Sequence, residues 1–137
     1  MTTVSIGTRN IGPGELVFVI AEAGVNHNGN PDLARSLIRA AADAGADAVK
    51  FQCFSAAELA APSASKAAYQ AIATDPTESQ FEMLKRLELP LSALPDLREY
   101  ARSQGLIFLA TPFDNTSLDC LIQLGVPAIK VSSADLT

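Results

Sequence analysis

Residues 20–30 read I-A-E-A-G-V-N-H-N-G-N, and this stretch decides how the chain is interpreted. The apolar run 16–21 that leads into it has the length and composition of a strand buried on both faces. Such a strand ends at Glu22, which places a carboxylate at the rim of a sheet. The loop that follows holds asparagine and histidine side chains between two glycines, a composition typical of tight turns that present hydrogen-bonding groups.

Strand and helix patterns alternate along the rest of the chain. Asn30 and Pro31 supply a cap and a first-turn proline for one helix, and Thr77 and Gln80 have capping-box spacing for another. Asp114 is placed to cap a third. The expected elements are a hairpin over 4–14, strands over 16–21, 46–52, 106–110 and 128–133, helices over 31–44, 77–87, 93–103 and 115–124, and an excursion over 53–76.

Chain composition limits the class of protein. The 137 residues are 48% hydrophobic and 18% charged, which is typical of one globular domain with a sizeable core. Ten scattered basic residues against fifteen acidic ones give a net charge of −5, without the basic footprint of a nucleic-acid-binding protein. Apolar runs are too short to cross a bilayer, and the N-terminus lacks a secretory pattern. We therefore expect a cytoplasmic protein that binds neither nucleic acid nor membrane.

The cysteines and the histidine offer no metal site. Cys53 and Cys120 lie far apart without metal-type spacing, so we read them as reduced core residues. His27 is the single histidine, which excludes any intrachain site that needs two imidazoles. A lone histidine in a loop is more often a hydrogen-bonded structural residue than a ligand, and we assign no residue of this chain to a metal.

Polar side chains recur at or just beyond the C-terminal ends of the predicted strands. Almost wholly apolar strands that alternate with helices indicate a parallel α/β fold, in which the loops after the strands converge on one face. Two lysines with hydroxyl and amide groups suit a phosphate or a carboxylate, and two acidic groups can orient a hydroxyl or move a proton. The residues expected to converge are Glu22, Lys50, Gln52, Thr111, Lys130, Ser133 and Asp135.

Several alternatives stay open from the residues alone. As alternatives to functional roles, Glu22 is readable as a rim carboxylate paired with Lys50, Thr111 as a strand-end cap, and Asp135 as the cap of a following helix. The loop after the first strand lacks the glycine-rich signatures for dinucleotides and for ATP, so these ligands are disfavoured. A doubly wound sheet and part of an eight-fold barrel both fit the alternation.

Five stretches resemble, in order, the N-terminal part of bacterial sialic acid synthases, the N-acetylneuraminate synthase family. They are 20–30, A-D-A-G-A-D-A-V-K-F-Q (42–52), E-S-Q-F-E-M-L-K-R-L-E-L (78–89), A-T-P-F-D (110–114) and G-V-P-A-I-K-V-S-S-A-D-L-T (125–137). The resemblance implies that residues 1–137 are a single domain, the first half of a TIM (β/α)8 barrel preceded by a short hairpin. The second half of the barrel and a C-terminal antifreeze-like domain then lie outside this chain.

The same resemblance implies a reaction and its participants. Phosphoenolpyruvate condenses with an N-acylated hexosamine, such as N-acetylmannosamine, to give a nine-carbon 2-keto sugar acid and phosphate. Relatives that make legionaminic or pseudaminic acid share these motifs, so the sugar stays open. A divalent metal, Mn²⁺ or Mg²⁺, polarises the sugar aldehyde, and the family's metal-binding histidines lie in the second half of the barrel.

Roles for individual residues also follow from the resemblance. Glu22 orients the sugar or removes a proton at it, and Asp135 handles water or a sugar hydroxyl. Phe113 lines the pocket. The residues implied to hold phosphoenolpyruvate are Lys50, Gln52, Thr111, Lys130 and Ser133.

A half-barrel has unpaired strand edges, so we expect this chain to form a homo-oligomer or to pair with a missing segment. We expect little or no synthase activity from the 137 residues alone. The alternatives are a non-catalytic α/β anion-binding or assembly module, and another phosphoenolpyruvate-dependent aldol synthase, such as one that makes a keto-deoxy sugar acid phosphate.

Overall fold

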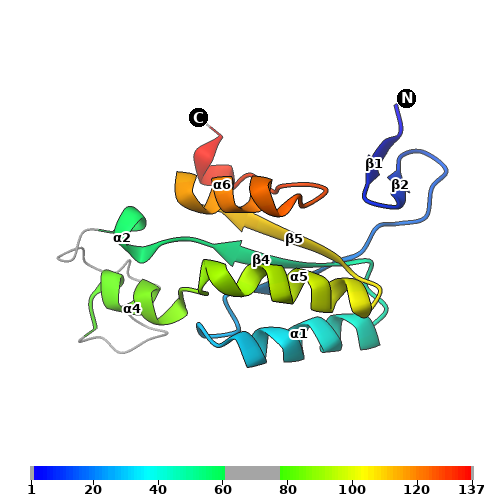
Figure 1. Ribbon diagram of the computed structural model, residues 1–137. Coiled ribbons are helices and arrows are strands. Elements are labelled where there is room, and N and C mark those ends of the chain that lie inside the picture. Colours follow the sequence, from blue (N-terminus) through cyan, green and yellow to red (C-terminus); the bar gives the residue numbers. More distant parts are fainter. Residues whose placement is uncertain (1, 61–77, 137) are drawn as a thin grey trace.

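A three-stranded parallel sheet forms the centre of the computed structural model, which describes residues 2–60 and 78–136 (Figure 1). The strand order is β3-β4-β5, with β3 at Ile20–Gly24, β4 at Ala48–Cys53 and β5 at Ile107–Pro112. Both pairings are parallel, as the alternation of strands and helices predicts.

The strand predicted over 128–133 is largely absent. Its place beside β5 is taken by a single parallel bridge between Ala110 and Ile129, with a backbone hydrogen bond of 3.3 Å from Lys130 to Ala110. The chain then turns into a short 3₁₀ helix, η2, at Ser133–Asp135. The prediction of a full strand is wrong here because the turn at Ser132, whose hydroxyl accepts from the Ala134 N–H, ends the extended segment early.

Two long helices cover one face of the sheet. Helix α1 (Pro31–Asp43) and helix α5 (Leu94–Ser103) lie side by side along the strands, and α6 (Asn115–Leu124) lies beside β5 (Figure 1). Between helices and sheet, large apolar side chains form one core: Ile38, Val49, Phe51, Leu94, Leu97, Phe108 and Leu121. None of the helices within residues 2–60 and 78–136 is long and apolar enough to cross a membrane.

Local capping explains where the helices begin. Asn30 Oδ1 accepts from the Asp32 N–H at 2.8 Å at the start of α1, and Asp114 Oδ1 accepts from the Ser117 N–H at 2.7 Å at the start of α6. Gly125 ends α6 with a positive φ of 69°. The predicted bounds of α1, α5 and α6 therefore agree with the structure to within one residue.

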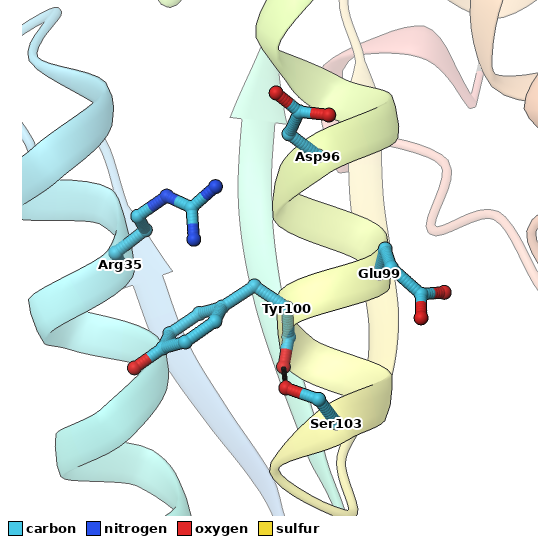
Figure 2. A pocket seen from close by; sticks show the side chains of 5 residues that line it. All are labelled: Arg35, Asp96, Glu99, Tyr100 and Ser103. Carbon is cyan, nitrogen blue, oxygen red and sulfur yellow. Dashed lines mark hydrogen bonds between the residues drawn. The ribbon is translucent and has the colours of Figure 1, made fainter.

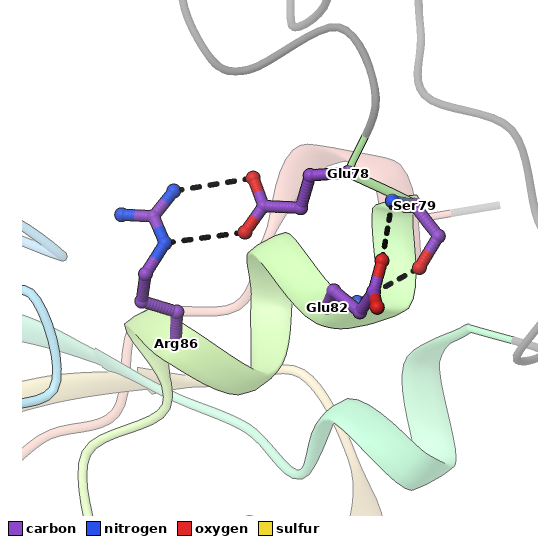
Figure 3. Close-up of polar contacts among 4 residues, drawn as sticks. All are labelled: Glu78, Ser79, Glu82 and Arg86. Atoms are coloured by element: carbon purple, nitrogen blue, oxygen red, sulfur yellow. Dashed lines mark hydrogen bonds and ion pairs between the residues drawn. The ribbon is translucent and has the colours of Figure 1, made fainter.

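Helix α4 (Gln80–Leu87) begins with a different capping box from the predicted one. Ser79 is the cap: its N–H donates to Glu82 Oε2 at 2.8 Å, and its hydroxyl accepts from the Glu82 N–H at 3.2 Å (Figure 3). Ser79 and Glu82 also have capping-box spacing, and the Glu82 carboxylate is a stronger acceptor than an amide at the third helical position. Thr77 lies outside the described residues.

Two segments depart from the predicted burial or extent. The apolar residues Leu16 and Val17 are 83% and 81% exposed, because β3 begins only at Ile20 and lies at the edge of the described sheet. The excursion predicted over 53–76 starts with the short helix α2 (Ala56–Leu59), and its remainder, from residue 61, lies outside the described residues.

The predicted hairpin is present as β1 (Val4–Ile6) paired antiparallel with β2 (Arg9–Ile11). Arg9 forms an ion pair with Asp47, whose other oxygen accepts from the Val19 N–H at 2.8 Å. Asp47 directly precedes β4, so this contact fixes the hairpin at the N-terminal ends of the strands. The opposite ends, where the predicted site residues lie, stay uncovered by it.

Candidate active site

Strand alternation separates the predicted site residues from the core. Val49 and Phe51 pack against the helices, so Lys50 and Gln52, which alternate with them along β4, lie on the other face of the sheet. Parallel register aligns Glu22 of β3 with Lys50, and Gln52 with Thr111 of β5. Four predicted residues therefore occupy adjacent positions on one face, near the C-terminal ends of three strands.

We call these four residues, Glu22, Lys50, Gln52 and Thr111, the row of site residues. Within it, Glu22 and Lys50 form an ion pair. The Lys50 side chain is only 14% exposed, whereas that of Glu22 is 51% exposed. The alternative reading of Glu22 as a rim carboxylate paired with lysine is thus what the structure shows. The pairing places a nearly buried cation below a carboxylate that solvent or a ligand can reach.

Gly24 brings the Gln52 amide to the same place. A methyl group on Gly24 would lie 3.4 Å from Glu22 Oε1 and 3.8 Å from Gln52 Nε2, and the residue adopts a φ of +55°. The pairing register of β3 with β4 shifts between Glu22 and Gly24. A glycine here lets the chain turn away without a side chain filling the space between the carboxylate and the amide. Sequence reasoning treated Gly24 only as a turn residue.

Thr111 contributes a buried hydroxyl without a partner. The residue is 2% exposed, and its Oγ1 has no hydrogen-bond partner among the described residues. The alternative in which this hydroxyl caps the strand end is therefore wrong. A buried polar atom left unpaired costs about 1–3 kcal/mol, which a ligand that supplies an acceptor would recover.

Lys130 lies next to Thr111 in the bridge beside β5. Ile129 pairs with Ala110 and packs against the helix-side core, so alternation assigns Lys130 to the same face as Thr111. Lys130 is exposed. The two predicted lysines therefore flank the Gln52–Thr111 pair on one face of the sheet.

Phe113 and Asp135 share a pocket that Glu22 does not line. This pocket of about 220 Å³ lies beside the start of α6 and is also lined by Asp114. Asp135 is exposed and belongs to η2, whose cap is Ser132. Ser133 is exposed as well. The structure thus places Asp135 with Phe113 in this pocket.

Two carboxylates hold the loop that follows β4. Asp114 Oδ2 accepts from the Ser55 N–H at 2.6 Å, and Glu88 Oε2 accepts from the Ala56 N–H at 2.9 Å. Asp114 was predicted only as a helix cap. Its second contact joins residues 59 positions apart, which no local sequence pattern signals.

Other polar clusters serve the helices. Arg35 of α1 and Tyr100 of α5 face each other across a pocket between these helices, with the guanidinium carbon 4.9 Å from the ring centroid (Figure 2). Arg86 makes a two-pronged contact with Glu78 at 3.2 and 3.3 Å beside the capping box of α4 (Figure 3). Both contacts join elements of the helical layer, so we assign them to packing.

The described residues do not fit a complete metal site. Within residues 2–60 and 78–136, no group of three or more His, Cys, Asp and Glu side chains is arranged to hold a metal ion. The only carboxylate in the Glu22 row is already paired with Lys50.

The sequence model of the NeuB family matches residues 37–137. The chain belongs to the NeuB family. Two similar NeuB relatives are N,N'-diacetyllegionaminic acid synthases: that of Campylobacter jejuni is 48% identical over 120 residues, which cover 88% of this chain and 36% of the relative. That of Legionella pneumophila is 46% identical over 131 residues, which cover 96% of this chain and 37% of the relative. The chain thus spans little more than a third of the length of these relatives.

A solved structure supports the fold assignment. The N-acetylneuraminic acid (sialic acid) synthetase of Leptospira borgpetersenii superposes with a TM-score of 0.80 at 32% identity, over 98% of this chain and 42% of that one. The predicted parallel (β/α) units of a (β/α)8 barrel are confirmed, and this NeuB chain covers part of the barrel.

Proposed function

We propose that this chain forms the phosphoenolpyruvate-binding side of a sialic-acid-type synthase. The complete enzyme would condense phosphoenolpyruvate with an N-acylated hexosamine to a nine-carbon 2-keto sugar acid and release phosphate. The observation that carries this proposal is the row of Glu22, Lys50, Gln52 and Thr111 on one face of the sheet. It combines a nearly buried cation, an amide and a buried hydroxyl without a partner in the described part of the chain.

Phosphoenolpyruvate carries a phosphate and a carboxylate. The side chains of the row and of Lys130 beside it offer the positive charge and hydrogen bonds that these two groups need. Lys50 and Lys130 supply positive charge, and the remaining groups proposed to hold the ligand supply hydrogen bonds: Gln52, Thr111 and Ser133. Because Lys50 is largely removed from solvent, its attraction to an anion is screened less than that of a surface lysine. Phe113 would line the pocket beside these groups.

The ligand would compete with Glu22 for Lys50. When the anion replaces Glu22 as the ion-pair partner of Lys50, the Glu22 carboxylate becomes available. It can then accept a hydrogen bond from a sugar hydroxyl or take the proton of that hydroxyl. The methylene carbon of phosphoenolpyruvate then bonds to the sugar aldehyde carbon, whose oxygen gains a proton. Water adds to the phosphate-bearing carbon, and loss of phosphate leaves the 2-keto acid. We propose that Asp135 handles this water or a sugar hydroxyl.

The finer assignments rest on the relatives. The two legionaminic acid synthases share 48% and 46% identity with this chain, against 32% for the sialic acid synthetase of known structure. This difference supports an N-acylated hexosamine of the kind used for legionaminic acid as the first sugar to test, with N-acetylmannosamine as the second. We propose Mn²⁺ or Mg²⁺ as cofactor of the complete site, with ligands outside the described residues.

The open edges of the sheet support a further part of the proposal. We propose that residues 1–137 act as a single domain, the N-terminal half of a barrel, which needs a second half to turn over substrate. Exposed Leu16, Val17 and Val19 lie next to the edge strand β3, and Val131 lies near the other edge. Homo-oligomerisation or pairing with a complementary segment would cover them.

Calorimetric titration of the 137-residue chain with phosphoenolpyruvate tests the binding part of the proposal. We expect Lys50→Met to weaken binding by about tenfold or more, in line with the loss of a charge-assisted contact worth about 1.5–3 kcal/mol. Lys85→Met is the matched control, because Lys85 is 62% exposed on α4 and pairs with Glu88. Equal affinities of the two variants would refute the assignment of Lys50.

Phosphate release tests the catalytic part. The short chain, incubated with phosphoenolpyruvate, either sugar and Mn²⁺, should release no phosphate above background, and robust turnover would overturn the need for a second half. Supplying the second half of a relative's barrel should restore release. Binding without turnover even then would favour a non-catalytic anion-binding module.

A further inference from the structure

His27 is buried in the loop that follows β3. Its side chain is fully enclosed, at 0% exposure, and the ring centroid lies 5.9 Å from that of Phe51 in the helix-side core. The loop thus has one polar side chain pointing into the protein, while its neighbours Asn26 and Asn28 are exposed. The two ring nitrogens of His27 differ: Nδ1 accepts a hydrogen bond, whereas Nε2 is buried and has no hydrogen-bond partner among residues 2–60 and 78–136.

The hydrogen bond that His27 makes fixes its tautomer. The Gly29 N–H donates to His27 Nδ1 at 3.0 Å. A ring nitrogen that accepts a hydrogen bond carries no proton, so the neutral ring must carry its proton on Nε2. Burial lowers the pKa of His27. A hydrogen-bonding interaction with the Gly24 backbone raises the pKa by a smaller amount. Both observations agree with a neutral ring at pH 7.

The loop itself has a tightly turned backbone. Gly24, Asn28 and Gly29 all adopt positive φ values, of 55°, 49° and 71°. Glycine adopts this conformation without strain and asparagine adopts it more readily than most other residues, so the sequence suits the turn. Three successive turn hydrogen bonds run through the loop, among them one of 3.0 Å from the Asn28 N–H to the Val25 carbonyl.

Both ends of the loop touch functional or structural neighbours. A methyl group on Gly29 would lie 2.6 Å from the Arg86 carbonyl oxygen, so this end packs directly against the end of α4. At the other end, Gly24 lies beside the Glu22 carboxylate and the Gln52 amide. A shift of the loop would therefore reach the row of site residues.

We infer that His27 is a positioning residue: as the neutral Nε2–H tautomer, it ties Gly29 through Nδ1 and so holds the loop of residues 24–30 in place beside Glu22 and Gln52. Its consequence for catalysis rests on the proposed function. The tautomer and the loop contact do not, and they are tested separately.

The first test is the tautomer. Long-range nitrogen–proton NMR of the ring is unambiguous because the chain has a single histidine. We expect a protonated Nε2 and an unprotonated Nδ1 at pH 7. A proton on Nδ1, or a charged ring, would overturn the inference even if no variant folds.

The second test is amide hydrogen exchange at Gly29, measured relative to global unfolding. His27→Phe keeps the ring volume but removes the acceptor, and we expect exchange at Gly29 to rise about tenfold. His27→Asn places an amide oxygen near the position of Nδ1 and should restore most of the protection. Leu121→Ala, which truncates a buried side chain in α6, is the control. It should leave exchange at Gly29, measured relative to global unfolding, unchanged.

The outcomes separate this inference from the proposed function. Unchanged exchange at Gly29 in His27→Phe, or failure of His27→Asn to restore it, would refute the role of His27. Absence of phosphoenolpyruvate binding by the unaltered chain, with the expected tautomer and exchange, would refute the proposed ligand instead. If both hold, His27→Phe should also shift the backbone amide signal of Gly24, and Leu121→Ala should not.

Discussion

Glu22 and Lys50 pair across aligned positions of β3 and β4, but they differ in how far each is removed from water. The lysine side chain is 14% exposed and the glutamate side chain 51% exposed. The two members of the pair are therefore not equivalent to substitution. Loss of the carboxylate leaves a poorly solvated cation, whereas loss of the ammonium leaves a carboxylate that water can reach.

We predict that Glu22→Gln lowers the free energy of unfolding by about 1 kcal/mol, and that Lys50→Met changes it less. The two variants should have opposite effects on phosphoenolpyruvate affinity, since Glu22→Gln removes the competing carboxylate and Lys50→Met removes the cation. Urea unfolding and calorimetry measure these effects. Weaker ligand binding by Glu22→Gln would contradict competition for Lys50.

Gly29 should tolerate substitution far less than another glycine of similar φ. Gly29→Ala meets the Arg86 carbonyl oxygen at 2.6 Å, whereas Gly45 has a φ of +76° with nothing within 4 Å. Both substitutions add the backbone cost of a Cβ in the left-handed region, about 1–2 kcal/mol. We expect Gly29→Ala to lose at least about 1 kcal/mol more than Gly45→Ala in urea unfolding, because the clash forces the backbone to move.

Burial of His27 should make stability depend on pH in the acidic range. Its pKa is lowered from 6.5 by desolvation, so the unfolded chain binds the proton more readily than the folded one. The contribution is therefore fully present above the unfolded pKa of 6.5 and is lost as the pH falls below it toward the folded pKa.

The matched variant for this prediction is His27→Asn, which removes the only histidine and leaves the carboxylates that both proteins share. We expect the stability of the unaltered chain to fall more steeply than that of the variant between about pH 7 and pH 5. Parallel curves from urea unfolding across this range would show that His27 does not titrate as its burial implies.

Asp114 should contribute more to the free energy of unfolding than a residue that only caps a helix. Asp114→Ala removes the acceptor for the Ser117 N–H in α6 and for the Ser55 N–H after β4, and we predict a loss of about 2 kcal/mol. Asp119→Ala removes a charge at an exposed position of the same helix and should change stability by less than about 0.5 kcal/mol. Similar losses in thermal unfolding would mean that charge, and not the two contacts, accounts for the effect.

Cys53 should be chemically inert. Burial raises the pKa of its thiol to about 12, so thiolate is scarce at pH 8. Cys120 is partly exposed and provides the comparison within the same chain. Alkylation of the folded chain, read by mass spectrometry of peptides, should label Cys120 and leave Cys53 unmodified until the protein is unfolded. Labelling of Cys53 in Cys120→Ser at the rate of a free thiol would contradict its burial.

Local patterns in the sequence were sufficient for most helices and for the direction of the sheet. The Asn30 and Asp114 caps and the Gly125 terminus each act within a few residues, and they set helix bounds that the structure reproduces. The capping box of α4 is predicted at Thr77 and Gln80, whereas Ser79 and Glu82 form it in the structure. The apolar run 16–21 was misjudged for burial because exposure depends on which strand lies alongside, not on the run itself.

The candidate site was predictable in its membership but not in its pairing. Sequence alone indicated that Glu22, Lys50, Gln52 and Thr111 follow parallel strands and should converge, since strand alternation and direction are local properties. Only the tertiary structure decided that Glu22 pairs with Lys50, that the Thr111 hydroxyl has no partner among the residues that the structure describes, and that Asp135 shares a pocket with Phe113. It also decided that His27 faces inward. These outcomes depend on register and packing between residues distant in the chain, and register is set by the whole core.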